Sequence, residues 1–415
     1  MGQQEDAEVI VVGGGPAGAS TAWALARDGI DVLLLDRARF PRDKICAEYL
    51  SPEASRILFD MGVLDEIERT NPSHLAGMRV RAPNGLVADG EFASNHGFRG
   101  FRDRGLAMRR TVLDEIVLRG ARAVGARVEE ETHVIDVYRN GSKRVEGVIV
   151  RDADGKQRTL RARYVVGADG LRSVVARRLG LVKTSRFWPR RIALVAHYQN
   201  VQGVGDMGEM HVDYDGYFGV VDVGGLMNVA VVVPLSQANK IVDKTEFFEN
   251  WIASRPHLAE RFQGAQRITP VRATGPFAAS TRHAWAPGAA LVGDAADFFD
   301  PFTGEGIYAA LRGGELLAPY LAEALYYESD TNEPRILAGY DRARKREFAG
   351  KWKLERIVGM AIAHPYFLNN AAKVLSRRKD LADLLVGVAG DFIPPRLVLG
   401  PRFLFTLFIS PAFRS

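Results

Sequence analysis

The chain has 415 residues, of which 47% are hydrophobic and 25% are charged, with 42 glycines, 19 prolines and one cysteine. This composition is typical of a globular protein and excludes a disordered, collagen-like or disulfide-stapled chain. The length predicts two or three domains, and the net charge of +5, spread along the chain, argues against a nucleic-acid partner.

The N-terminal elements predict a βαβ unit. Residues 8–12 (EVIVV) form a β-branched run, Gly13–Gly18 a turn, and residues 19–28 an Ala-rich helix. Residues 31–35 (DVLLL) then form a second buried strand that ends at Asp36. Two parallel strands joined by a helix are therefore expected.

The uncharged stretch Val9–Ala26 could be mistaken for a signal peptide or a membrane span. Acidic Glu5, Asp6 and Glu8 precede it, where a signal peptide needs Lys or Arg, and a run of glycines interrupts it. We expect neither signal peptide nor membrane span, and therefore a cytoplasmic protein.

The middle of the chain predicts antiparallel sheets. Residues 134–137, 144–151 and 159–166 form a three-stranded meander, with Asn-Gly at 140–141 and Asp-Gly at 154–155 as turns. Residues 192–233 contain four more strand-like segments with Gly-rich joints. They are too long for a loop and predict a separate, mostly antiparallel sheet.

The C-terminal part returns to helical patterns. An apolar strand at residues 289–292 leads to a helix at 306–327, and helices follow from about 334 to 389. The segment 392–413 is apolar and interrupted by prolines. Its uncharged run from Phe403 to Phe413 is too short to span a bilayer. Core packing is one interpretation, and peripheral membrane contact beside Arg396 and Arg402 is another.

The turn GGGPAG carries the first functional motif. Gly13, Gly15 and Gly18 have the GxGxxG spacing between a strand and a helix, which predicts a dinucleotide diphosphate at the helix N-terminus. Asp36 ends the second strand, where a carboxylate can bind a ribose. A second match, GVGDMG at residues 203–208, precedes a strand rather than a helix, so we interpret it as a hairpin turn.

Three further segments resemble motifs of the flavoprotein superfamily that contains p-hydroxybenzoate hydroxylase and the geranylgeranyl reductases. Residues 110–114 (RTVLD) resemble its R-x-x-L/F-D segment, and residues 167–173 (GADGLRS) its DG motif. Residues 293–296 (GDAA), followed by 300–307 (DPFTGEGI), resemble its GD motif with the DPxTGEG extension. Together with GGGPAG, these motifs occur in the family's order.

The resemblance implies a mixed α/β fold in which a Rossmann-like FAD-binding domain of the glutathione-reductase type is interleaved with an antiparallel-sheet substrate domain. The expected FAD-binding domain comprises residues 1–75, 102–182 and 270–330, and the substrate domain residues 76–101 and 183–269. A C-terminal helical region covers residues 331–415. FAD is the implied cofactor and NAD(P)H the electron donor.

Motifs and resemblance together imply a set of cofactor-binding residues: Gly13, Gly15, Pro16, Ala17, Gly18, Asp36, Arg37, Lys44, Cys46, Arg110, Val134, Asp169, Gly293, Asp294, Pro301, Gly304, Glu305, Gly306 and Ile307. The eight histidines are scattered and the single cysteine cannot form a thiolate cage, so no metal site is expected. The lone cysteine also fits a reducing compartment.

The segment KICAEYLSPEA at residues 44–54 resembles the K-x-C-G-x segment of the geranylgeranyl reductases, which implies reduction of an isoprenoid-type double bond in a lipophilic substrate. Cys46 is then a catalytic candidate over the flavin, or a small buried hydrophobe. Tyr217 is a second catalytic candidate, and Tyr214, His197 and Glu48 are further possible proton donors. Each of these four is also compatible with a structural role.

Two alternatives stay open. Ala47 stands where the reductases have glycine, and flavoproteins thought to hydroxylate long-chain phenols have a similar KxCxEYLSPEA stretch, so a monooxygenase acting on an aromatic or polyketide-derived substrate is possible. A flavin-binding scaffold without turnover is the alternative of another class. Halogenation is disfavoured because the five tryptophans are isolated and the WxWxIP signature is absent. The sequence does not indicate an oligomeric state.

Overall fold

The computed structural model describes residues 5–93, 96–184, 190–327 and 331–408. Its first sheet has the strand order β20-β21-β11-β1-β2-β8, with β10 paired to β11 and β9 paired to β10. Strand β1 (Ala7–Val12) pairs in parallel with both β2 (Val32–Leu35) and β11 (Gln157–Gly167). The other strands are β8 (Arg127–Glu129), β9 (His133–Tyr138), β10 (Gly147–Arg151), β20 (Trp285–Ala286) and β21 (Ala289–Leu291).

The predicted βαβ unit and meander are both confirmed. Helix α1 (Pro16–Arg27) joins β1 to β2 and begins three residues before the predicted start, because Pro16 suits the first helical position. Strands β9, β10 and β11 pair antiparallel as expected, and β10 begins at Gly147 rather than at residue 144.

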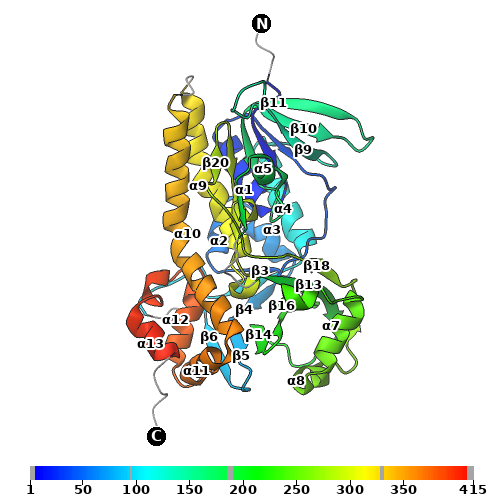
Figure 1. The fold of residues 1–415 in the computed structure, drawn as a ribbon, viewed down its shortest axis with the longest axis vertical. Coiled ribbons are helices and arrows are strands. Elements are labelled where there is room, and N and C mark those ends of the chain that lie inside the picture. Colours follow the sequence, from blue (N-terminus) through cyan, green and yellow to red (C-terminus); the bar gives the residue numbers. More distant parts are fainter. Residues whose placement is uncertain (1–4, 94–95, 185–189, 328–330, 409–415) are drawn as a thin grey trace.

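Helices cover this sheet (Figure 1). They are α2 (Ala54–Asp60), α3 (Leu64–Arg69), α4 (Arg110–Ala123), α5 (Val174–Arg178) and α9 (Gly306–Tyr326). Helices α1 and α9 approach each other closely, since a Cβ on Gly314 would lie 2.3 Å from the Ser20 Oγ. The contact of these helices places the segment before α9 at the start of α1.

The second sheet has the order β17-β13-β16-β15-β14-β5-β6, with β18 also paired to β13. Its strands are β5 (Gly77–Arg81), β6 (Val87–Glu91), β13 (Arg191–Gln199), β14 (Met207–Asp213), β15 (Gly216–Asp222), β16 (Met227–Pro234), β17 (Gln266–Arg267) and β18 (Arg272–Thr274). The expected antiparallel pairing holds for β13 to β16, whereas β5 joins β14 in parallel. The sequence predicts that the chain returns to the FAD-binding domain at residue 270. Because β18 ends at Thr274 and belongs to the second sheet, the chain returns to the first sheet only after that residue.

The hairpin interpretation of GVGDMG is wrong. Residues 203–208 connect β13 to β14, but β16 and β15 lie between these strands in the sheet. The loop therefore bridges two strands that are not neighbours. Helices α6 (Leu235–Ala238), α7 (Lys244–Ala253) and α8 (Pro256–Ala259) lie between β16 and β17 in the chain, and Phe248, Trp251 and Leu258 pack on the sheet.

Two small three-stranded sheets lie apart from the two large sheets. One contains β3 (Tyr49–Leu50), β4 (Ser73–Leu75) and β7 (Gly105–Ala107), and the other β12 (Val182–Thr184), β19 (Ala279–Thr281) and β22 (Asp297–Phe298).

The predicted C-terminal helices are present. Helix α10 (Glu333–Ala363) runs along one side of the molecule to α11 (Pro365–Leu375), α12 (Lys379–Ala389) and α13 (Pro401–Phe408) at its end (Figure 1). Helix α12 packs on β6, where a Cβ on Gly90 would lie 2.5 Å from Val386. The expected apolar run to Phe413 extends beyond the described residues. No described helix has the length and hydropathy needed to cross a bilayer.

Candidate functional site

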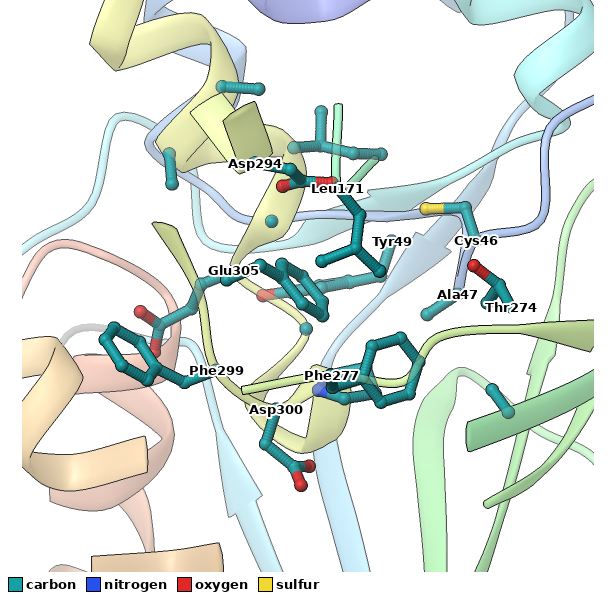
Figure 2. Close-up of a pocket in the computed structure, with 18 of the residues that line it drawn as sticks. Cys46, Ala47, Tyr49, Leu171, Thr274, Phe277, Asp294, Phe299, Asp300 and Glu305 are labelled. Carbon is teal, nitrogen blue, oxygen red and sulfur yellow. The ribbon is translucent and has the colours of Figure 1, made fainter. Parts of the chain in front are cut away.

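A large pocket lies between the start of α1, the loop of residues 44–49, the segment 293–307 and the second sheet. Figure 2 shows side chains from these separate stretches converging on it, with Cys46 on one side and Glu305 and Phe299 on the other. Pocket-lining residues from the predicted set are Gly15, Pro16, Ala17, Lys44, Cys46, Arg110, Tyr217, Gly293, Asp294, Pro301, Gly304, Glu305, Gly306 and Ile307.

Gly13, Gly15 and Gly18 each have a different structural role in the turn. A Cβ on Gly18 would lie 1.8 Å from the Gly13 oxygen, and Gly13 itself has φ +105 and packs against the Ala168 carbonyl. Gly15 precedes α1 and lines the pocket. No side chain caps the N-terminus of α1, so its first N–H groups and its positive dipole end are available to an anion.

Three predicted residues on the adjacent strands do not line the pocket. The buried Asp36 carboxylate accepts hydrogen bonds from the Gly14 N–H (2.7 Å) and the Ala38 N–H (2.8 Å), so it holds the glycine turn in place. Arg37 is exposed, and Val134 is buried in β9.

Buried cations gather near the start of α1. Arg110 makes a two-pronged ion pair with Asp114 (2.6 and 2.7 Å), and Arg42 also contacts Asp114 at 2.9 Å. Burial and the neighbouring Arg110 lower the pKa of Lys44. Burial raises the pKa of Asp294, while Lys44 and Arg110 act in the opposite direction. A carboxyl group beside two cations suits a ligand with both hydroxyl and phosphate groups.

The two aspartates at strand ends differ in role. Asp169 accepts hydrogen bonds from the Val174 N–H (2.6 Å) and Val175 N–H (3.4 Å) at the start of α5, and burial raises its pKa. Asp169 does not line the pocket, although the following Gly170 and Leu171 do. Asp294 points into the pocket (Figure 2).

The segment 293–307 turns sharply at two glycines. Gly293 has φ +61, and its Cβ would lie 2.9 Å from the Ala17 Cβ. Gly304 has φ +75, and its Cβ would lie 2.7 Å from the Tyr49 ring. Only glycine fits both positions. The chain thereby passes close to α1 at Gly293 and close to the Tyr49 ring at Gly304.

Cys46 lies on a loop that a buried polar cluster holds against the second sheet. Its carbonyl accepts a hydrogen bond from Asn228 Nδ2 (2.9 Å). The same Nδ2 lies 2.9 Å from Glu48 Oε2, which is also 2.7 Å from His197 Nε2. Glu48 has φ +60, a conformation unusual for a residue with a side chain. The pKa of Arg110 is raised by Asp114 and by the nearby Cys46, against the effect of burial.

Asn228 is a residue of this cluster that no sequence motif predicted. Its signal is a lone amide at residue 228 in the apolar strand MNVAVVVP, where a buried polar side chain needs a partner.

Tyr217 lines the pocket, but its hydroxyl is engaged. It donates a hydrogen bond to Asp300 Oδ1 (2.8 Å), and Arg191 binds the other oxygen of Asp300 at 2.7 Å. Burial and the Asp300 carboxylate raise the pKa of Tyr217 well above its ordinary value. This arrangement makes Tyr217 a weak acid that holds Asp300 in place. The possible donor Tyr214 is 73% exposed and lies outside the pocket lining.

Comparisons with known proteins agree with this geometry. A menaquinone reductase from Mycolicibacterium smegmatis is 28% identical over 402 residues, covering 93% of this chain and 92% of that protein. Digeranylgeranylglycerophospholipid reductase 2 from Methanopyrus kandleri is also 28% identical over 402 residues, covering 92% and 93%. Conditioned medium factor receptor 1 from Dictyostelium discoideum is 28% identical over 383 residues, covering 89% and 74%.

Among solved structures, a myxobacterial chondrochloren halogenase has a similar fold. It superposes with a TM-score of 0.78 at 28% identity, covering 85% of this chain and 82% of that one. The fold, the glycine turn and the relatives together define an FAD-dependent oxidoreductase. The chain belongs to the FAD binding domain family, whose family model matches residues 6–351.

The pocket fits this cofactor. The glycine turn leaves room that a Cβ would fill, the start of α1 is uncapped, and Lys44, Arg110 and Asp294 offer the charges that suit a diphosphate and a ribityl chain.

Proposed function

We propose that the protein uses NAD(P)H to reduce a lipophilic substrate at an isoprenoid-type double bond. The observation that carries this proposal is the apolar wall that the second sheet presents to the pocket beside Cys46. Side chains that form it are Met78, Val195, Met210, Val221, Ala230 and Val232. Such a wall suits a prenyl chain. Two relatives of this chain are a menaquinone reductase and a digeranylgeranylglycerophospholipid reductase.

The residues that hold FAD follow from the pocket. Gly15, Pro16 and Ala17 would bind the diphosphate at the start of α1, with Lys44 and Arg110 beside it. Asp294 would accept a hydrogen bond from a ribityl hydroxyl. Bound FAD supplies the hydride chemistry, and the protein positions the substrate, excludes water and supplies a proton.

Cys46 is the proposed proton donor or substrate-shaping group. It lines the pocket on the same side as Ala47 and Thr274 (Figure 2), and its loop is fixed by Asn228 and Glu48. The experiment is anaerobic reoxidation of the reduced holoenzyme by a prenylated naphthoquinone, with mass analysis of the product. We expect reoxidation and a product that still carries two additional hydrogens after air has returned its ring to the quinone, because reduction of the ring alone is reversed by that step. Cys46→Ser should slow this reoxidation at least about tenfold and leave flavin reduction by NAD(P)H unchanged.

A monooxygenase is the second candidate, because Ala47 departs from the reductase pattern and a halogenase has a similar fold. In that case the side chain of the quinone would gain no hydrogens without oxygen, and with oxygen a phenolic lipid would gain an oxygen atom. A scaffold without turnover would show neither reaction.

Membrane contact is part of the proposal. Helices α11 and α13 pack together and expose Tyr366 (75%) and Phe405 (55%), with Lys373 and Arg402 also exposed on them. Exposed aromatic and basic side chains favour a lipid surface, where a prenylated substrate dissolves. We also propose a cytoplasmic location and the division into the three regions expected above, with the last FAD-binding segment beginning after β18 rather than at residue 270.

A further inference from the structure

One end of the pocket is polar, in contrast to the apolar wall. Tyr49, Glu305, Lys351 and Glu355 line it, together with Phe299 and Trp352. In Figure 2, Glu305 and Phe299 lie on the side of the pocket away from Cys46, and the Glu305 carboxyl group points toward Phe299. This end is formed by β3, by the turn before α9 and by helix α10.

Tyr49 brings a hydroxyl group to this end without a protein partner. The side chain is buried, with 4% of the residue exposed, and its hydroxyl has no hydrogen bond among the described residues. Phe92 stacks on its ring with a centroid distance of 6.1 Å, and Gly304 packs against the ring edge. The hydroxyl is therefore rigidly placed, and a buried hydroxyl costs free energy unless something binds it.

Glu305 and Lys351 form a buried ion pair at the same place. Lys351 Nζ lies 3.3 Å from Glu305 Oε2 and also contacts the Asp391 carboxylate. Burial raises the pKa of Glu305, and Lys351 acts against this effect. One ammonium group is thus shared between two carboxyl groups, so Lys351 has no charge to spare for an anionic ligand.

Glu355 lies one helical turn after Lys351. Burial, followed by the neighbouring Glu305 and Asp300, raises its pKa well above the ordinary value, so this site disfavours further negative charge. Arg344 is the other cation that lines this end, and its Nη1 lies 2.5 Å from Asp297 Oδ2, so its charge is paired. The described residues at this end of the pocket therefore offer a ligand hydrogen-bonding groups, whereas the positive charges of Lys351 and Arg344 are already paired with carboxylates.

We propose that Tyr49, Glu305 and Glu355 bind the head group of the substrate, and that this head group is a neutral ring bearing hydroxyl or carbonyl oxygens, as in a quinone or phenol, rather than a phosphate. This inference rests on the proposed function, because it assumes that the apolar wall holds the substrate's chain. Lys351 is a positioning residue that holds Glu305.

The test is a binding measurement on the oxidised holoenzyme without NAD(P)H, so that it does not depend on turnover. The probes are a naphthoquinone with two isoprene units and geranyl monophosphate, which has a chain of the same length. Binding is followed by the change in the flavin spectrum. We expect the quinone to bind at least about tenfold more tightly than the phosphate, since an unpaired buried charge is costly.

Variants assign the head group to these residues. Tyr49→Phe and Glu355→Leu should each weaken quinone binding about fivefold to twentyfold, which corresponds to one lost hydrogen bond. Glu355→Gln should bind the quinone nearly as wild type does, because an amide of the same length keeps a hydrogen-bond donor and an acceptor at this position. Tyr214→Phe is the matched control on an exposed tyrosine and should change nothing.

Three results would overturn the proposal. The first is binding of the phosphate as tightly as the quinone, and the second is unchanged quinone affinity in both Tyr49→Phe and Glu355→Leu. The third is faster loss of FAD from these variants, which would assign the polar end to the cofactor. If the proposed reduction fails while the quinone binds as described, the function is wrong and the head-group site stands.

Discussion

Glu48 Oε2 lies 2.7 Å from His197 Nε2, and this contact joins the loop of residues 44–49, which contains Cys46, to strand β13 of the second sheet. Both side chains are buried, and Glu48 also accepts a hydrogen bond from the Arg110 N–H (2.8 Å). Two distant parts of the chain therefore meet at one carboxylate. This carboxylate holds Glu48 in its left-handed conformation, which would otherwise be unfavourable.

Replacing that carboxylate should destabilise the fold. Glu48→Gln cannot accept from every donor around it, so we expect a loss of about 1–3 kcal/mol in the free energy of unfolding. Chemical denaturation monitored by tryptophan fluorescence measures the loss. Glu131→Gln is the matched control, because Glu131 also has a positive φ (+55) but is exposed. Equal stability of the two variants would contradict the prediction.

The glycine turn should not tolerate a methyl group at Gly18. The new Cβ of Gly18→Ala would overlap the Gly13 carbonyl, so α1 must shift from β1 at a cost of about 1–3 kcal/mol or more. We expect FAD to be lost on gel filtration, as measured by flavin absorbance. Gly205→Ala, in the second GxGxxG match, has open space and should keep its FAD. Retention of FAD in both variants would show that the turn does not hold the cofactor.

Glu209 makes the stability of the second sheet sensitive to acid. Burial alone would raise the pKa of Glu209, but hydrogen bonds from His211 and Arg261 lower it to about 2. Because the folded-state pKa lies below the ordinary value of 4.5, the stabilisation is complete above that value and is lost as the pH falls toward 2.

Glu209→Gln removes this effect, so the difference in Tm between wild type and variant should be large at neutral pH and shrink near about pH 3. Thermal unfolding followed by circular dichroism measures it. Glu260→Gln, a change at an exposed glutamate next to Arg261, should leave the pH dependence as in wild type. A difference that stays constant with pH would contradict the assignment.

Membrane contact predicts a loss of vesicle binding when the exposed aromatic surface is removed. Each of Tyr366→Ser and Phe405→Ser removes apolar area worth about 1.5–3 kcal/mol if it is buried in lipid. We expect the double variant to bind vesicles with anionic phospholipid at least about tenfold more weakly in co-sedimentation. Phe59→Ser, at an exposed phenylalanine (59%) on α2, is the control. Unchanged sedimentation of the double variant would rule out this surface.

The sequence predicted the first sheet well because its signals are local. Alternating and continuous apolar runs, a glycine turn at 13–18 and Asn-Gly at 140–141 each specify structure within a few residues. It failed for the loop 203–208, because strand order depends on which distant strand pairs with β13. No periodicity carries that information.

The candidate site shows the same division. Motif positions such as Gly15 and Asp294 were predicted and line the pocket. Asn228, which binds the carbonyl of Cys46, and Glu355, which lines the polar end of the pocket, are distant in sequence and belong to no motif. Their relevance arises only from burial, because a polar group becomes informative when water is removed from it.

The parallel pairing of β5 with β14 has a consequence for anyone who would exchange substrate pockets between relatives. Strand β5 ends at Arg81. Strand β14 belongs to the stretch that begins with β13, more than a hundred residues further along the chain. A transplant of residues 191–274 alone would therefore carry a sheet with an unfilled edge. A functional chimera needs both pieces from the same donor, inserted together, and a library that recombines them separately should yield mostly insoluble chains.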